Sequence, residues 1–293
     1  MAGEKTIQLY LMDGIPKGRI KATLANWTGI AYKIPRTELD KAKNIKYLKQ
    51  SGVYFLFSPS DETQENIVYI GQAGTRKNGE GVLNRLQEHK RNPKEDYWTE
   101  AVAFTTTNNT FGPTEISYLE NQFTKLASDI SRYTVKNGNE PTQGHVTEEK
   151  ESELKEFIDY TKIVIGTLGY HLFEPLIEDV PQNTISKKEI QSNPRLFLRP
   201  KNNQTINTTA KQTSEGLVLL KGSHINTIDS ASVPKKISIR RKEKGLILNG
   251  ILQEDVLFGS PSSAASFVVG SSINGKEAWK DEQGRSLNEI EKI

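Results

Sequence analysis

The sequence predicts an α+β protein in which a small, mainly antiparallel sheet is flanked by helices, followed by a second, smaller α+β domain. Two apolar runs, Val53–Phe57 and Ile67–Ile70, are rich in β-branched and aromatic residues and enclose a polar segment. This pattern is typical of a hairpin with a long loop. Residues 113–130 carry an apolar stripe with helical spacing. The polar stretch 178–214 then separates a C-terminal segment that has apolar runs of its own.

These patterns divide the 293 residues into four parts, and the length suits one large or two modest domains. Residues 1–50 form a strand-rich lead-in, and residues 51–177 form the main α+β domain. Residues 178–214 are polar and rich in asparagine, so we expect a linker there, with one strand at Arg195–Arg199. Residues 215–293 form a C-terminal accessory domain.

The elements of the first half follow in order. In the lead-in, Thr6–Met12 is a candidate strand, and a helix is expected over residues 35–48. After the hairpin comes a glycine-rich loop and then a helix over Val82–Arg91. Pro93 ends this helix, because the residue before a proline avoids helical geometry. Trp98–Thr105 is expected to add a further strand to the sheet.

Later elements are read in the same way. Pro113 begins a helix, since proline suits the first helical position. Another helix is expected over residues 147–170. In the accessory domain, Gly216–Leu220 and Ile237–Ile239 are candidate strands, and Ser260–Val269 is a short helix. The helix from Pro113 buries an apolar stripe at Ile116, Leu119, Phe123, Leu126 and Ile130.

Composition excludes several kinds of protein. The absence of cysteine excludes disulfides, thiolate metal sites and a cysteine nucleophile. There is no apolar run long enough to span a bilayer, and the N-terminus lacks the pattern of a secretory signal. We therefore expect a soluble, cytoplasmic protein without a membrane partner. The net charge of +3 is mild, so only its local distribution could favour nucleic acid.

The hairpin and its following helices gather residues suited to phosphate chemistry. Each strand carries a tyrosine beside a glycine, Tyr54 and Tyr69. Arg85 and His89 are four residues apart and share a helix face. Arginine binds phosphate oxygens in a bidentate way, and histidine or tyrosine can move a proton. Glu120 borders the apolar stripe of its helix, where a carboxylate needs a partner or a cation.

The order of these features resembles the GIY-YIG nuclease family. GVY stands for the first half of the signature and YIG for the second. Arg85 and His89 in NRLQEHK match the family's arginine and histidine, and Glu120 in ISYLENQF matches its glutamate. The match depends on all of these features occurring in order, and it covers roughly residues 50–140.

The resemblance implies a metal-dependent DNA endonuclease whose catalytic residues are Tyr54, Tyr69, Arg85, His89 and Glu120. Glu120 would bind one Mg²⁺ or Mn²⁺, because oxygen ligands suit these ions. Arg85 would hold the scissile phosphate and stabilise the transition state. One tyrosine, paired with the other or with His89, would take a proton from the attacking water, and the sequence does not choose between the two.

Further contacts are implied around this site. The family often has a lysine after YIG, where this chain has Gln72, so Arg76 or Lys77 would supply the positive charge. An asparagine usually follows the glutamate helix in the family. Asn137 is expected to fill that role, with Asn139 as the alternative.

The C-terminal domain resembles a module of unassigned role that recurs behind such nuclease domains. Between Lys211 and Gly250 the charge is +5, which suggests contacts to DNA phosphates. The alternative for the whole chain is a non-catalytic DNA-binding or regulatory protein that keeps the nuclease fold. The residues expected to touch phosphate here are Lys235, Lys236, Arg240, Arg241 and Lys242.

Overall fold

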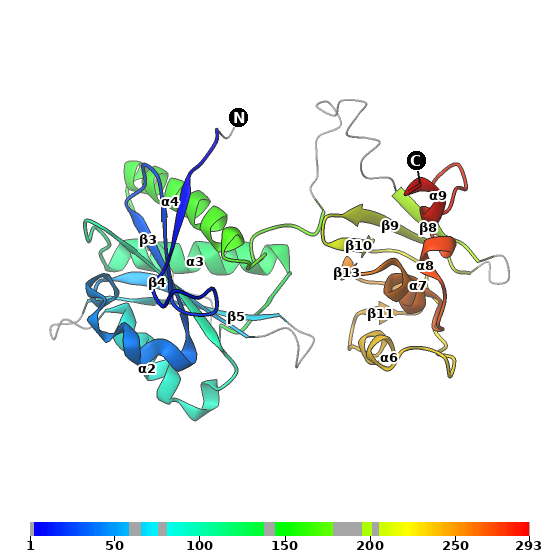
Figure 1. Ribbon diagram of the computed structural model, residues 1–293, viewed down its shortest axis with the longest axis horizontal. Coiled ribbons are helices and arrows are strands. Elements are labelled where there is room, and N and C mark those ends of the chain that lie inside the picture. Colours follow the sequence, from blue (N-terminus) through cyan, green and yellow to red (C-terminus); the bar gives the residue numbers. More distant parts are fainter. Residues whose placement is uncertain are drawn as a thin grey trace. The chain divides into compact units, whose positions relative to one another are not determined.

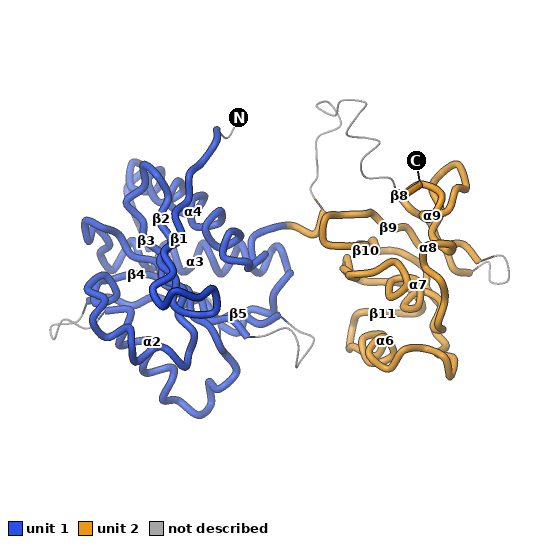
Figure 2. Tube along the Cα trace, in the orientation of Figure 1, with its two compact units in different colours: residues 1–174 blue, residues 175–293 orange. Residues whose placement is uncertain are grey.

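The computed structural model describes two compact units, Met1–Glu174 (unit 1) and Pro175–Ile293 (unit 2), shown in Figure 2. No helix among the described residues is both long and apolar enough to cross a membrane. Both units mix helices with strands, so the α+β fold class is confirmed. The described residues are 3–58, 66–75, 81–137, 144–177, 195–200 and 205–292.

Unit 1 is built on a sheet that has seven strands among the described residues, in the order β1-β2-β3-β6-β4-β5-β7. Neighbouring strands are antiparallel, except that β7 runs parallel to β5. The sheet is larger than the sequence predicted, because the lead-in supplies three of its strands. The strands are β1 (Ile7–Leu11), β2 (Ile20–Leu24), β3 (Gly29–Pro35), β4 (Gly52–Phe57), β5 (Ile67–Ala73), β6 (Glu100–Thr106) and β7 (Thr134–Val135).

Helices cover both faces of this sheet (Figure 1). Helices α3 (Pro113–Ile130) and α4 (Glu148–Thr167) pack on one face, and α2 (Val82–Arg91) packs on the other. Every residue of the central strand β4 is buried, because both of its faces are covered. Its apolar run is therefore continuous and does not alternate with polar residues.

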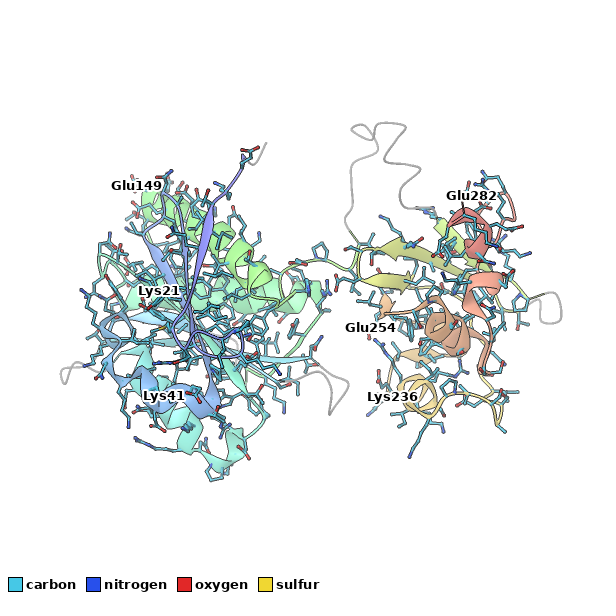
Figure 3. The ribbon with its side chains drawn as sticks, viewed as in Figure 1. Lys21, Lys41, Glu149, Lys236, Glu254 and Glu282 are labelled. Carbon is cyan, nitrogen blue, oxygen red and sulfur yellow. The ribbon has the colours of Figure 1, made fainter. Side chains whose placement is uncertain are left out.

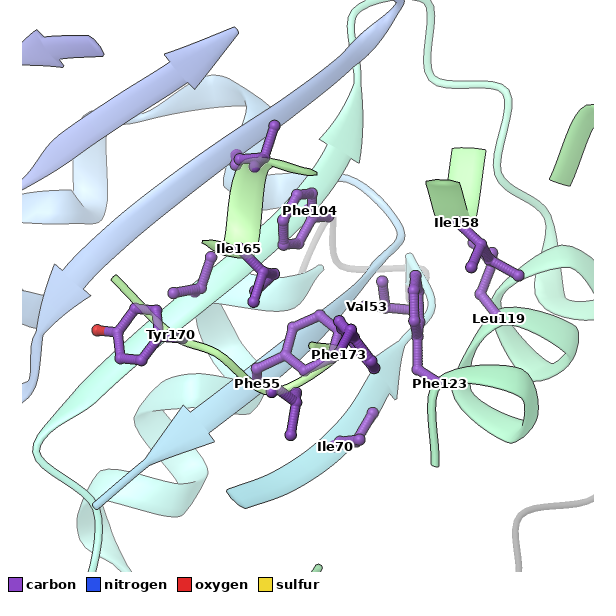
Figure 4. Close-up of a cluster of buried hydrophobic side chains, with 14 of the residues drawn as sticks. Val53, Phe55, Ile70, Phe104, Leu119, Phe123, Ile158, Ile165, Tyr170 and Phe173 are labelled. Carbon is purple, nitrogen blue, oxygen red and sulfur yellow. The ribbon is translucent and has the colours of Figure 1, made fainter. Parts of the chain in front are cut away.

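Aromatic rings fill the core on the α3 side of the sheet (Figure 4). The Phe55 ring meets those of Phe123, Phe104 and Phe173 at centroid distances of 5.2, 5.8 and 5.9 Å. Such edge-to-face pairs add to the free energy gained by burying the rings. This packing fixes α3 against β4 and so determines where the polar edge of α3 lies.

The lead-in over residues 1–50 belongs to unit 1, because β3 pairs along its whole length with β6. The helix expected over residues 35–48 is instead two 3-10 segments, η1 (Arg36–Asn44) and η2 (Lys46–Lys49). Ile45 separates them, since its backbone is extended and its side chain packs against the core.

Unit 2 contains its own sheet, an antiparallel one in the order β13-β10-β9-β8. Helix α7 packs on this sheet, and the Phe267 and Trp279 side chains are completely buried in the core. The strands are β8 (Arg195–Leu198), β9 (Thr208–Thr213), β10 (Gly216–Leu219) and β13 (Val256–Phe258), with a ribbon of β11 (Ile247–Leu248) and β12 (Ile251–Leu252). The helices are α6 (Lys235–Arg241), α7 (Pro261–Val269), α8 (Gly275–Ala278) and α9 (Leu287–Ile290).

Two expectations for this region also need correction. The region expected to be a linker, residues 178–214, contains β8, where a strand was expected near Arg195, and also β9, which was not expected. These two strands pair with each other and join the sheet of unit 2. Residues 178–194 lie outside the described residues. The strand expected at Ile237–Ile239 is part of helix α6, because helical geometry buries Ile237 and leaves Ile239 exposed.

Candidate active site

The two tyrosines lie on one face of the hairpin. Tyr54 is opposite Gly71 in the register of β4 and β5, and Tyr69 is opposite Leu56. Their ring centroids are 6.2 Å apart. A Cβ atom at Gly71 would lie 2.3 Å from the Tyr54 hydroxyl oxygen, so only glycine leaves room for this phenol. The packing of Tyr54 therefore explains why the YIG motif has a glycine at this position.

His89 lies against both tyrosines. Leu86 packs α2 on the sheet, and the His89 side chain is only 2% exposed. The His89 Nε2 atom is 2.8 Å from the Tyr54 hydroxyl oxygen, and Nδ1 contacts the carboxylate of Glu95. Burial lowers the pKa of His89, and the Glu95 carboxylate opposes that shift. The imidazole thus links a phenol on one side to a carboxylate on the other.

Arg85 lies one turn earlier on α2 and is more accessible. Its Nη1 donates to Glu88 Oε2 at 2.7 Å, and 41% of its side chain is exposed. Burial raises the pKa of Tyr54, while the neighbouring Arg85 guanidinium opposes that rise. Arg85 lines a cavity of about 360 Å³ together with Gln72, Ala73, Gly74, Gly81, Asn84 and Glu88. A half-exposed guanidinium in a cavity of this size can receive a phosphate group.

Glu120 approaches from the other face of the sheet. Gln72 at the end of β5 donates from Nε2 to Glu120 Oε2 at 2.9 Å and to Ser117 Oγ at 3.0 Å. Burial raises the pKa of Glu120, while the bond from Gln72 and the positive charge of Arg85 oppose the rise. The carboxylate and the guanidinium therefore influence each other across the end of β5.

The surroundings of Glu120 fit a hard divalent cation. Within the described ranges, no lysine or arginine forms an ion pair with this half-buried carboxylate. The nearby side-chain oxygens come from Gln72 and Ser117, which hydrogen bond to each other. An oxygen-only donor set with one carboxylate suits Mg²⁺ or Mn²⁺ and not zinc.

Asn137 hydrogen bonds to the backbone of β5. Its Oδ1 accepts from the backbone nitrogen of Ile70 at 3.1 Å, and its Nδ2 donates to the carbonyl of Ile70 at 2.7 Å. The amide thus extends the pairing of β7 along the edge of β5, and both of its polar groups have backbone partners there. Arg76, Lys77 and Asn139 lie outside the described residues.

The basic residues expected to bind DNA in unit 2 separate into two kinds. Lys235, Lys236 and Lys242 are exposed, and Lys236 on α6 is labelled in Figure 3. Arg241 is buried, pairs with Asp229 at 2.6 Å and donates to two backbone carbonyls, so its guanidinium is bonded within unit 2. Arg240 donates to the carbonyl of Leu257 at 3.0 Å, and burial lowers its pKa.

Sequence reasoning missed Glu95 and Glu88. Glu95 ends a 3-10 turn, η3 (Pro93–Glu95), and reaches His89 across a break in the helix. No helical spacing relates the two residues, so no periodic pattern could have paired them. Glu88 is three residues after Arg85 on α2, and that spacing was a usable signal for their ion pair.

Comparison with known proteins identifies only the C-terminal part of the chain. A search of curated proteins found no match, and a search of solved structures found none either. Residues 198–291 match a family described as a domain of unknown function, DUF4357. This match confirms the module expected at the C-terminus and places its start within β8, ahead of the boundary at residue 215.

Proposed function

We propose that this protein is a divalent-metal-dependent endonuclease that hydrolyses DNA phosphodiester bonds at the end of β5 in unit 1. One observation carries the proposal. Tyr54, His89, Arg85 and Glu120 come from three separate elements, β4, α2 and α3, and meet around the end of that strand. Such a gathering of an acid–base pair, a guanidinium and a half-buried carboxylate is suited to phosphoryl chemistry.

Arg85 is the phosphate anchor in this proposal. In the free protein Arg85 donates from Nη1 to the carboxylate of Glu88, so one of its N–H groups already has a partner. A bound phosphate would replace Glu88, since a phosphate offers two oxygens to the planar fork of arginine. The resulting movement of Arg85 would also change the electrostatic effect of the guanidinium on the Tyr54 hydroxyl.

Tyr54 and His89 handle the proton of the attacking water. The Tyr54 hydroxyl gives its proton to Nε2 of His89 as its oxygen takes one from the water. The hydroxide formed makes the new bond to phosphorus, and the bond from phosphorus to the 3′ oxygen breaks. The leaving oxygen takes a proton from solvent water, and the imidazolium returns its proton to solvent.

Glu120 holds the cation that the reaction requires. Bound there, a divalent ion would supply positive charge to a non-bridging oxygen and to the leaving 3′ oxygen. Gln72 orients the carboxylate by donating to Oε2. The electrostatic effect of Arg85 already favours the ionised form of Glu120, which is the form a cation needs.

Unit 2 helps to hold DNA in this proposal. Its contribution comes from the exposed lysines of α6 and the turn that follows, Lys235, Lys236 and Lys242. Contacts from lysine to phosphate position a duplex without reading its sequence. The proposal therefore assigns no target sequence to either unit.

A plasmid-nicking assay tests the proposal. Supercoiled plasmid is incubated with the full-length protein and Mg²⁺, Mn²⁺ or EDTA, and the open-circular and linear forms are quantified on a gel. We expect nicking with either ion and none with EDTA. An absence of cleavage of plasmid, linear duplex and single-stranded DNA with both ions, together with retained DNA binding, would favour a non-catalytic DNA-binding protein.

A further inference from the structure

Glu95 is a half-buried partner of the acid–base pair that the sequence did not indicate. Its carboxylate contacts Nδ1 of His89, on the opposite side of the ring from Tyr54. Only 2% of the His89 side chain and 30% of the Glu95 side chain are exposed. The contact is therefore shielded from solvent, where a hydrogen bond to a charged group is stronger.

The segment that carries Glu95 is held in place by several contacts. The Asn92 side chain accepts from the backbone nitrogen of Lys94 at 3.1 Å and caps η3. Arg36 donates from Nη1 to the carbonyl of Glu95 at 3.0 Å, and its guanidinium lies over the Trp98 ring at 4.7 Å. These contacts fix the backbone of Glu95 from outside α2, so its carboxylate is aimed before any substrate binds.

The two partners of His89 determine where its proton lies. A carboxylate can only accept, so the hydrogen bond to Glu95 requires a proton on Nδ1. The neutral ring then has its lone pair on Nε2, which can only accept from the Tyr54 hydroxyl. In this tautomer the Tyr54 proton points at the atom that is to receive it.

We propose that Glu95 is a positioning residue that keeps His89 in the Nδ1-protonated tautomer, so that Nε2 receives the proton of Tyr54. The proposal rests on the function proposed above. The Glu95 carboxylate takes no proton, and it stabilises the imidazolium that forms when Tyr54 gives up its own. The other ionisable groups that face the His89 ring are Tyr54 from β4, Tyr69 from β5, and Arg85 and Glu88 from α2.

The first test measures the tautomer directly and does not need activity. Long-range ¹H–¹⁵N spectra of the full-length protein are recorded near pH 8, about 1.5 units above the ordinary pKa of histidine. A His89→Gln variant assigns the signals. We expect a protonated Nδ1 and a bare Nε2. Glu95→Gln should keep this pattern, because its amide oxygen still accepts, whereas Glu95→Ala should lose it.

The second test measures the pH dependence of cleavage. The neutral imidazole is the proton acceptor, so kcat falls as pH decreases through the pKa of His89. Glu95→Gln removes the negative charge that stabilises the imidazolium, so the pKa of His89 becomes lower. The fall of kcat at acidic pH should therefore begin at a lower pH than in the wild type. We also expect kcat to fall about 10- to 100-fold with little change in KM, as happens when the carboxylate behind a working imidazole is lost at metal sites.

A matched control separates positioning from general damage to the fold. Asp96→Asn removes a neighbouring carboxylate that is 81% exposed and paired with Arg36, and it should change neither the tautomer nor the pH profile. A protonated Nε2 on His89 in the wild type would overturn the proposal whether or not the protein cleaves DNA. An equal loss of rate at every pH in Glu95→Gln would also overturn it. Failure of the proposed function would appear separately, as absent cleavage with an unchanged tautomer.

Discussion

Replacing Tyr54 by phenylalanine removes one oxygen atom and should separate the chemistry from the fold. The hydroxyl is fully buried and lies 2.8 Å from Nε2 of His89, so the variant leaves Nε2 without its partner. An unsatisfied buried polar group costs about 1–3 kcal/mol of unfolding free energy. For a unit the size of Met1–Glu174, each kcal/mol lowers Tm by about 2–4 °C. The aromatic core is retained, so the variant should fold.

The loss of activity should be far larger than this loss of stability. A positioned acid–base group contributes about 10²- to 10⁴-fold to a rate, so Tyr54→Phe should lose that factor in nicking rate. Tyr69→Phe is the matched control, because Tyr69 is half-buried and its described contacts are between rings. Nicking rates and thermal unfolding are measured for both variants. Wild-type rates in Tyr54→Phe, or equal losses in the two variants, would refute the proposal that the Tyr54 hydroxyl takes the proton from the attacking water.

Two further predictions concern unit 2. Arg241→Met should lower the unfolding free energy of unit 2 by about 3–5 kcal/mol, because Asp229 and two backbone carbonyls lose their buried donor. Denaturant unfolding measures the change in free energy. An unchanged unfolding midpoint would contradict the prediction. Changing Lys235, Lys236 and Lys242 together to alanine should reduce the salt slope of DNA affinity by about 3, one per lost phosphate contact. Lys155→Ala on α4 is the control and should leave the salt slope unchanged. A triple variant with the same salt slope as the wild type would contradict a role of these lysines of unit 2 in DNA binding.

Local sequence patterns were sufficient to predict those elements whose structure depends on one short segment of the chain. The strands β4 and β5 follow from runs of β-branched and aromatic residues, and α3 follows from its apolar stripe. The opposition of Tyr54 and Gly71 could be expected from the hairpin once its register was known. Glu120 lies at the border of the apolar face of α3, as its spacing indicated.

What the sequence could not show depends on packing between distant segments. The pairing of β3 with β6 joins residues that are about 70 positions apart, and no local pattern encodes it. Arg241 and Lys242 are equally basic in the sequence, yet only Arg241 meets Asp229 and is buried. Asn137 looked like a ligand because of its place after α3, but the edge of β5 takes both of its polar groups.

The most direct test of the account compares cleavage and DNA binding in Glu120→Gln. The amide keeps the size of the side chain and removes the negative charge that a divalent cation needs. With Mg²⁺ present, plasmid nicking should disappear, while DNA affinity, measured by fluorescence anisotropy, should stay near that of the wild type. Glu149→Gln, at the exposed start of α4, is the control and should cleave normally (Figure 3). Normal nicking by Glu120→Gln would contradict the central claim that Glu120 holds the catalytic metal.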